Sequence, residues 1–107
     1  MKQGDVYWHT FRSPDKRRPV LILTRSSMIP YLTGITVAPI TTTIRNIPSE
    51  VFLSVADGMD TGCAVNLDNI QTIQKSQLGA YITSLSDDLM RDVRAAIEFV
   101  FDFNAMS

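Results

Sequence analysis

The chain has 107 residues, of which 45% are apolar and 20% charged, with one cysteine, one histidine and a formal net charge of −1 at pH 7. One cysteine excludes an intramolecular disulfide, and one cysteine with one histidine excludes a structural zinc site built from those ligands. A chain of this length buries roughly two thirds of its unfolded surface, so we expect a single domain over residues 1–107 whose core needs no cross-link.

The N-terminal residues predict a strand and no leader. The segment MKQGDVYWHTF lacks the apolar core of a signal peptide, and no apolar run in the sequence reaches the length of a membrane span. Within it, Asp5–Phe11 alternates in the manner of a strand. We therefore expect a soluble cytoplasmic protein without a membrane partner.

An arginine-rich turn leads into the second predicted strand. The segment SPDKRRP is turn material, and PVLILT over residues 19–24 has the length and continuous apolar character of a strand buried on both faces. Residues 1–53 hold seven cations and three anions, whereas residues 54–107 hold three cations and eight anions. The five cations between Arg12 and Arg25 form a patch that can attract an anion; the alternative is a solvated loop.

Short strands separated by turns fill the middle of the chain. We expect them over residues 34–43, 51–53, 63–67 and 69–73. Pro39 cannot donate to a strand ladder, so it marks a strand end, an edge or a bulge. Five or six short strands with tight turns predict a small barrel.

The C-terminal part has the pattern of a capped amphipathic helix. Ser84 and Asp87 fit a capping box, and the aspartates at 87 and 88 favour the positive end of the helix dipole. We expect the apolar stripe to pack against the barrel, with a partner-binding face as the alternative. Its members recur at helical spacing: Leu89, Met90, Val93, Ala96, Ile97, Val100 and Phe101.

Few side chains are available for nucleophilic chemistry. Cys63 begins an apolar strand and is more typical of a small buried hydrophobe than of a nucleophile. His9 lies between Trp8 and Phe11 in sequence and is more typical of a packed, hydrogen-bonded side chain than of a base. Neither a glycine-rich nucleotide motif nor a phosphate-loop lysine is present.

Guanidinium and hydroxyl donors gather at predicted strand ends. Arg18 precedes Pro19, whose ring biases Arg18 to an extended backbone and holds its side chain at the rim of a strand. Arginine offers five N–H donors in a rigid fork and stays charged, which suits a phosphate. Residues 41–43 add three threonine hydroxyls at the end of the next strand, although threonine runs are also common in strands for propensity alone.

Four spaced segments carry a family resemblance: GDVYW at 4–8, RPVLIL at 18–23, VAPITTTIR at 37–45 and VNLDNIQTIQKSQL at 65–78. In this order they resemble the signatures of the MazF/PemK family, the toxins of type II toxin–antitoxin modules. The segment from residue 82 to 103 is similar to the family's closing strand and helix. The resemblance covers nearly the whole chain, and four motifs together are far more specific than any one.

The resemblance implies a mainly β fold: a small SH3-like barrel of the MazF/PemK/CcdB type with a C-terminal α-helix, assembled as a homodimer. It implies an endoribonuclease without cofactor or metal that cuts single-stranded mRNA at short sequences. The ribose 2′-hydroxyl attacks the adjacent phosphate and leaves a 2′,3′-cyclic phosphate and a 5′-hydroxyl. It also implies a cognate antitoxin with a disordered tail that covers the basic groove, and DNA binding by the toxin–antitoxin complex.

The resemblance gives three residues catalytic roles. Arg18 matches the family's arginine before proline, which stabilises the phosphorane and shuttles a proton. Thr41 matches a hydroxyl donor to a phosphate oxygen, and Asp68 matches an aspartate that acts as base in some members. Asn66 stands where those members have a partner arginine, which favours the arginine-plus-threonine scheme. The loop over residues 12–17 is shorter and more basic than is usual in the family.

The basic side of the molecule is the expected RNA-binding surface. Trp8 or Phe11 is expected to stack on bases, although a core position is the stronger expectation for Trp8. Asn66, Asn69 and Gln71 offer amides to base edges, or are ordinary strand-surface polarity. The phosphate backbone is expected along four cations: Arg12, Lys16, Arg17 and Arg45.

Two other functions remain open. A non-catalytic binding toxin of the same fold, the gyrase-poison type, acts through the extreme C-terminus, and the tail FNAMS here has no terminal tryptophan. The other is an interaction module in which Arg18 only anchors a salt bridge. RNA cleavage without metal would separate both from the nuclease.

Overall fold

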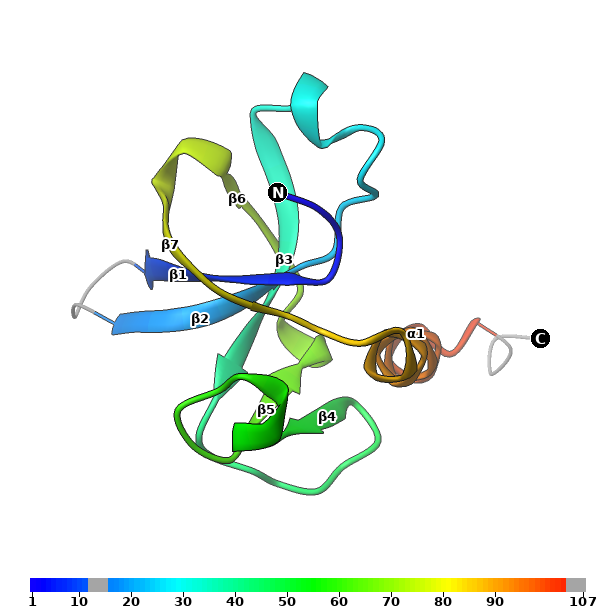
Figure 1. Cartoon of the computed structure of the whole chain (residues 1–107). Coiled ribbons are helices and arrows are strands. Elements are labelled where there is room, and N and C mark those ends of the chain that lie inside the picture. The colour runs from blue at the N-terminus through cyan, green and yellow to red at the C-terminus, as the bar shows by residue number, and fades with distance from the viewer. Residues whose placement is uncertain (12–15, 104–107) are drawn as a thin grey trace.

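The computed structural model describes residues 1–11 and 16–103, which form a mainly β structure with a C-terminal helix (Figure 1). This confirms the predicted architecture. Short 3-10 turns lie at Ile29–Tyr31, Val55–Asp57, Leu67–Asn69 (η3) and Lys75–Gln77. The strands and helix are β1 Asp5–Phe11, β2 Lys16–Ile22, β3 Gly34–Thr41, β4 Glu50–Leu53, β5 Cys63–Asn66, β6 Gln71–Gln74, β7 Leu78–Ser84 and α1 Asp87–Phe101.

The strands pair in the order β4-β5-β3-β2-β1-β7, every pair being antiparallel, and β6 also pairs with β3. On the edge of β3 away from β2, residues 34–37 pair with β6 and residues 40–41 pair with β5. Pro39 lies between these two ladders, so it marks a break in the pairing inside β3 instead of the end of the strand. Because two partners share one edge, the sheet bends here.

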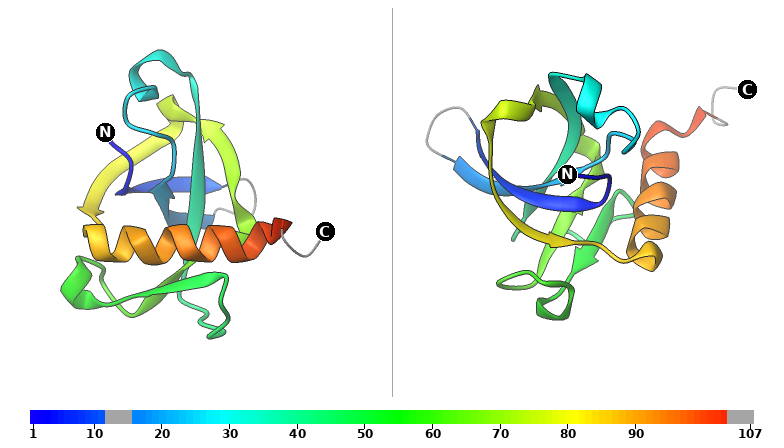
Figure 2. Two further views of the ribbon diagram at one scale, coloured as in Figure 1. Left: turned by 90° about the vertical axis from the view of Figure 1, so that its right-hand side faces the viewer. Right: turned by 45° about the horizontal axis from the view of Figure 1, so that its top comes forward.

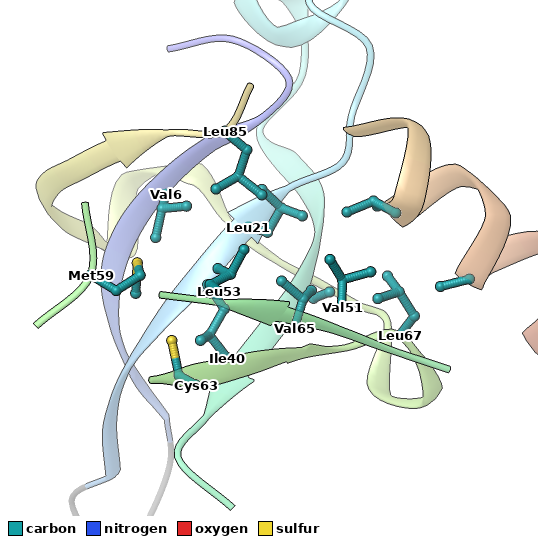
Figure 3. Close-up of a cluster of buried hydrophobic side chains, with 13 residues drawn as sticks. Val6, Leu21, Ile40, Val51, Leu53, Met59, Cys63, Val65, Leu67 and Leu85 are labelled. Carbon is teal, nitrogen blue, oxygen red and sulfur yellow. The ribbon is translucent and has the colours of Figure 1, made fainter. Parts of the chain in front are cut away.

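Two apolar cores lie on opposite faces of β1, β2 and β3. Val20, Leu21 and Ile22 are all fully buried, as the PVLILT run predicts, although β2 starts earlier and ends earlier than residues 19–24. The outer core contains Val20, Ile22, Ile29, Ile35 and Val37. The helix-side core, most of which Figure 3 labels, contains Val6, Leu21, Ala38, Ile40, Val51, Leu53, Met59, Cys63, Val65, Leu67, Leu85, Val93 and Ala96.

The helix packs its apolar stripe on the helix-side core, as predicted, and Figure 2 shows it lying across the molecule beside β4. Phe101, the last member of the predicted stripe, is exposed. The predicted capping box is wrong: Ser86 is the N-cap, and its hydroxyl accepts the Leu89 backbone N–H at 3.2 Å. Ser84 ends β7 and donates instead to Asp5 at 2.7 Å.

Of the helices described, none combines the length and the apolar character needed to cross a membrane.

Candidate functional site

Strand alternation separates the two central arginines of the basic segment. In the β1–β2 register, Arg18 lies opposite His9 and Arg17 lies opposite Thr10, so the two arginine side chains point to opposite faces of the sheet. The Arg17 guanidinium carbon lies 4.3 Å from the centroid of the Trp8 ring. Only Arg18 therefore lies on the face of the outer core.

A cavity of about 410 Å³ opens where β1 and β3 end and β2 begins, and we call it the strand-end cavity. It brings together most of the predicted site residues, although they come from segments far apart in the chain. Pro39 and Thr43 also line it; Pro39 and Thr41 share one face of β3, and Thr43 follows the bend after that strand. The predicted residues that line it are Phe11, Arg18, Thr41, Arg45, Asn66, Asn69 and Gln71.

Five predicted site residues are not placed in this cavity. Trp8 lines a different cavity. Arg17 lies on the other face of the sheet, and Asp68 is not among the lining residues. Arg12 lies outside the described residues, as does the side chain of Lys16.

The strand-end cavity is positively charged. Its charged side chains are Arg18 and Arg45, and no carboxylate lines it within the described part of the chain. Arg18 is half-buried and makes no hydrogen bond or ion pair with any residue that the structure describes. A partly desolvated guanidinium with all its donors available is a strong anion-binding group.

The hydroxyl group of Thr41 is oriented by a local hydrogen bond. The hydroxyl oxygen accepts the backbone N–H of Thr43 at 3.1 Å, two residues further along the chain. Because a hydroxyl has two lone pairs and one hydrogen, this contact uses an acceptor position and leaves the hydrogen for donation to a ligand.

Arg45 is held in place by a carboxylate that sequence reasoning missed. The Glu50 side chain is 3% exposed, and its oxygens accept the Arg45 side-chain Nε–H at 3.2 Å and the Arg45 backbone N–H at 2.9 Å. The terminal amino groups of Arg45 are not used in these contacts. Nothing in the local sequence signals this pairing, because Glu50 begins β4 after an irregular segment.

Asn66 and Asp68 organise the turn η3. The Asn66 side-chain oxygen accepts the Asp68 backbone N–H at 3.0 Å, which leaves the amide N–H groups of Asn66 available. The Asp68 carboxylate accepts the Ser49 hydroxyl at 2.5 Å, and Ser49 is 2% exposed. Asp68 therefore ties η3 to the residues before β4 and does not face the cavity.

His9 and Cys63 are packed, as predicted. His9 is 6% exposed and meets the Phe11 ring edge-on at 4.6 Å between centroids, but its Nδ1 atom has no hydrogen-bond partner among the described residues, contrary to the prediction. Burial, with a contribution from the Asp57 charge, raises the pKa of the Cys63 thiol. Within residues 1–11 and 16–103, no three histidine, cysteine or carboxylate side chains gather as metal ligands.

The chain is similar to a known family and to curated proteins over most of its length. Residues 2–101 match the model of the family described as PemK-like, MazF-like toxins of type II toxin–antitoxin systems. Endoribonuclease MazF3 of Mycobacterium tuberculosis is 43% identical over 90 residues, which are 84% of this chain and 87% of that protein. Probable endoribonuclease MazF5 of the same species is 38% identical over 101 residues, 94% of this chain and 92% of that protein.

Solved structures agree with the sequence relatives. The Mycobacterium tuberculosis toxin MazF-mt6 superimposes with a TM-score of 0.85 at 40% identity, covering 92% of this chain and 96% of that chain. An endoribonuclease in complex with its cognate antitoxin from a mycobacterial species superimposes with a TM-score of 0.85 at 27% identity, covering 96% of each chain.

Proposed function

The chain belongs to the PemK-like, MazF-like toxin family of type II toxin–antitoxin systems, whose curated relatives are endoribonucleases, and we propose that it cuts single-stranded mRNA in the cytoplasm without a metal ion. The observation that carries this proposal is the strand-end cavity. There an arginine whose donors are unused by the described residues and a threonine with an oriented hydroxyl line one positively charged surface. Phosphate is the RNA group that such a surface binds.

In the proposed reaction, the ribose 2′-oxygen forms a bond to phosphorus as the bond from phosphorus to the 5′-oxygen breaks. One proton leaves the 2′-hydroxyl and one is gained by the departing 5′-oxygen, giving a 2′,3′-cyclic phosphate and a 5′-hydroxyl. Arg18 stabilises the phosphorane charge and relays the proton, and Thr41 donates to a phosphate oxygen. The scheme needs no metal ion as an electrophile.

The geometry supports the arginine-plus-threonine scheme over one centred on Asp68. The Asp68 carboxylate is already engaged by Ser49 and is absent from the lining of the strand-end cavity. We assign it a positioning role, because it anchors η3, which carries Asn69 into the cavity and follows Asn66. We propose that these two amides and Phe11 contact bases. Arg45, together with Arg12 and Lys16, is proposed to contact the RNA backbone.

We further propose a homodimer that is inhibited by a cognate antitoxin with a disordered tail, and DNA binding by that complex. Exposed aromatic side chains support a protein-binding surface: Phe52 on β4 and Phe99 on α1 are each more than half exposed and line one groove. Light scattering on the purified toxin tests the dimer.

The decisive experiment is cleavage of a long single-stranded RNA in excess EDTA, with the ends of the fragments mapped. We expect discrete cuts with 5′-hydroxyl ends from the wild type, and none from Arg18→Ala. Arg25→Ala is the matched control, because it removes an exposed arginine that does not line the strand-end cavity. A folded wild-type protein that cuts none of several RNAs would overturn the proposal in favour of a non-catalytic binding toxin.

A further inference from the structure

A second cavity, of about 150 Å³, lies on the other face of the same strand ends. Its walls are apolar and come from Trp8, Pro19, Ile40, Met59, Cys63 and Ile82. We call it the Trp8 cavity. It shares one residue, Thr41, with the strand-end cavity.

The two cavities are separated by the strands themselves. Trp8 and Pro19 face each other across β1 and β2, and they lie on the opposite face from Arg18. Ile40, Met59 and Cys63 belong to the helix-side core, and Figure 3 shows them at the end of that core away from α1. A ligand that binds in both cavities must therefore pass over the end of β3 at Thr41.

The rim of the Trp8 cavity carries polar side chains that form no side-chain hydrogen bond with the described residues. Thr42, Asp60 and Thr61 line it, and none of the three makes a side-chain hydrogen bond with the residues described. Asp60 follows a tight turn in which Gly58 has a φ of +100°. The Thr83 hydroxyl on β7 donates to the backbone oxygen of Asp57 at 3.1 Å and fixes this turn to the sheet.

This combination of an aromatic wall, an apolar floor and a polar rim fits a nucleobase. A base has apolar faces that stack on aromatic rings and a polar edge that needs hydrogen-bond partners. Arg17, stacked on Trp8, adds a positive charge beside the cavity for the RNA backbone. An apolar side chain of an acidic peptide fits less well, because it would leave Asp60 and both threonines unpaired and would meet the negative charge of Asp60.

We propose that the Trp8 cavity binds one nucleobase of the substrate, that of a nucleotide adjoining the cleaved phosphate, and that Asp60 selects a base with an exocyclic amino group. The inference rests on the proposed function, since Thr41 is the residue that joins the two cavities. A carboxylate only accepts hydrogen bonds, so it pairs with the 4-amino group of cytosine and is repelled by the 4-carbonyl oxygen of uracil. These two bases form a matched pair of probes.

Trp8 is the one tryptophan of the sequence, so tryptophan fluorescence reports on a residue that lines this cavity. We would titrate the wild type with 2′-fluoro hexanucleotides of cytidine or of uridine, which lack the attacking hydroxyl. We expect quenching, with the cytidine oligomer binding about tenfold more tightly, the effect of one discriminating hydrogen-bonded pair. Asp60→Asn should bring the two affinities within about twofold, because a carboxamide both donates and accepts.

Asp88→Asn is the control, since it removes an exposed carboxylate on α1 that lines neither RNA cavity nor the groove lined by Phe52 and Phe99, and it should keep the preference for cytidine. Equal affinities in the wild type, a preference that survives Asp60→Asn, or quenching only by an acidic leucine-bearing peptide would each overturn the proposal. Cleavage of RNA in EDTA by the same preparation is scored separately. Cleavage without quenching removes the base site but leaves the nuclease, whereas selective quenching without cleavage removes the nuclease but leaves the base site.

Discussion

Polar side chains at the two ends of the β1–β2 pair differ in whether they form hydrogen bonds within the protein. At the end where β1 begins, Asp5 is 5% exposed, and its carboxylate accepts the Ser84 hydroxyl at 2.7 Å and the Lys2 backbone N–H at 2.9 Å. At the other end, Arg18 has no partner among the described residues, and Thr41 keeps its hydroxyl hydrogen free. One end is closed by hydrogen bonds within the protein, whereas the other presents unused donors to a cavity.

The difference separates polar groups that hold the fold from polar groups that are available to a ligand. A buried carboxylate without partners would be costly, so the hydrogen bonds around Asp5 are a condition of its burial. Donors at the rim of a cavity are hydrated and can exchange water for a phosphate. Variants at the first end should therefore change the free energy of unfolding, and variants at the second should change catalysis.

After the loss of cleavage expected from Arg18→Ala, the largest effect is expected from Thr41→Val, which keeps the shape of the side chain and removes the hydroxyl. Loss of one oriented donor to a reacting oxygen typically lowers the rate about 10²–10³-fold. Single-turnover cleavage of RNA measures it, and Thr41→Ser, which restores the hydroxyl, should recover most of the rate. If Thr41→Val cuts at the wild-type rate, Thr41 does not contact the phosphate.

Asp5→Asn should have the next largest effect, on stability instead of on rate. The carboxamide cannot accept from all of the donors that surround the carboxylate, and an unsatisfied buried polar group costs about 1–3 kcal/mol. Urea denaturation measures the change in the free energy of unfolding. The folded fraction should cleave RNA at the wild-type rate, because Asp5 lies at the far end of β1; a rate loss comparable with that of Thr41→Val would break the comparison.

The same carboxyl predicts a pH dependence of stability. Burial opposes its ionisation, but the hydrogen bonds from Ser84 and Lys2 outweigh burial and hold the pKa of Asp5 below its usual 3.8. Because the folded-state pKa is the lower one, Asp5 stabilises the fold above pH 3.8, and this contribution is lost as the pH falls through the folded-state value. In acid titrations, the difference in stability between the wild type and Asp5→Asn should shrink below pH 3.8. A constant difference would show that Asp5 titrates normally.

Much of this arrangement could be predicted from the sequence, and what could not be predicted depends on contacts between distant residues. The bounds of β1 agree with the prediction, because alternation is a local signal. The side-chain partners of Ser84 and Asp68 are Asp5 and Ser49, which lie 79 and 19 residues away. Contacts at such separations leave no local pattern, so the capping-box motif misassigned Ser84, and the sequence could not show that the Asp68 carboxylate is engaged by Ser49.

The arginines show a second limit of local patterns. Charge alone places Arg17 and Arg18 in one basic patch, yet neighbouring residues of a strand point to opposite faces. The period of two was present in the sequence and would have separated them once β2 was extended back to Lys16. The Trp8 cavity could not be predicted, because its walls come from five strands and a loop that only the fold brings together.

The smallest effect on stability is expected from Lys2→Ala. This variant tests whether the Lys2 charge or the hydrogen bonds stabilise the buried Asp5 carboxylate. The Lys2 ammonium lies 3.4 Å from the Asp5 carboxylate, but its side chain is 62% exposed, and exposed ion pairs contribute about 0–1 kcal/mol. Lys2→Ala keeps the backbone N–H that donates to Asp5, so we expect a loss of stability near the lower limit of that range and little dependence on salt. Ser84→Ala removes a buried hydrogen bond and should cost more, about 1 kcal/mol. If Lys2→Ala proves the more damaging of the two, then charge attraction, and not hydrogen bonding to Ser84, keeps Asp5 buried at the closed end of β1.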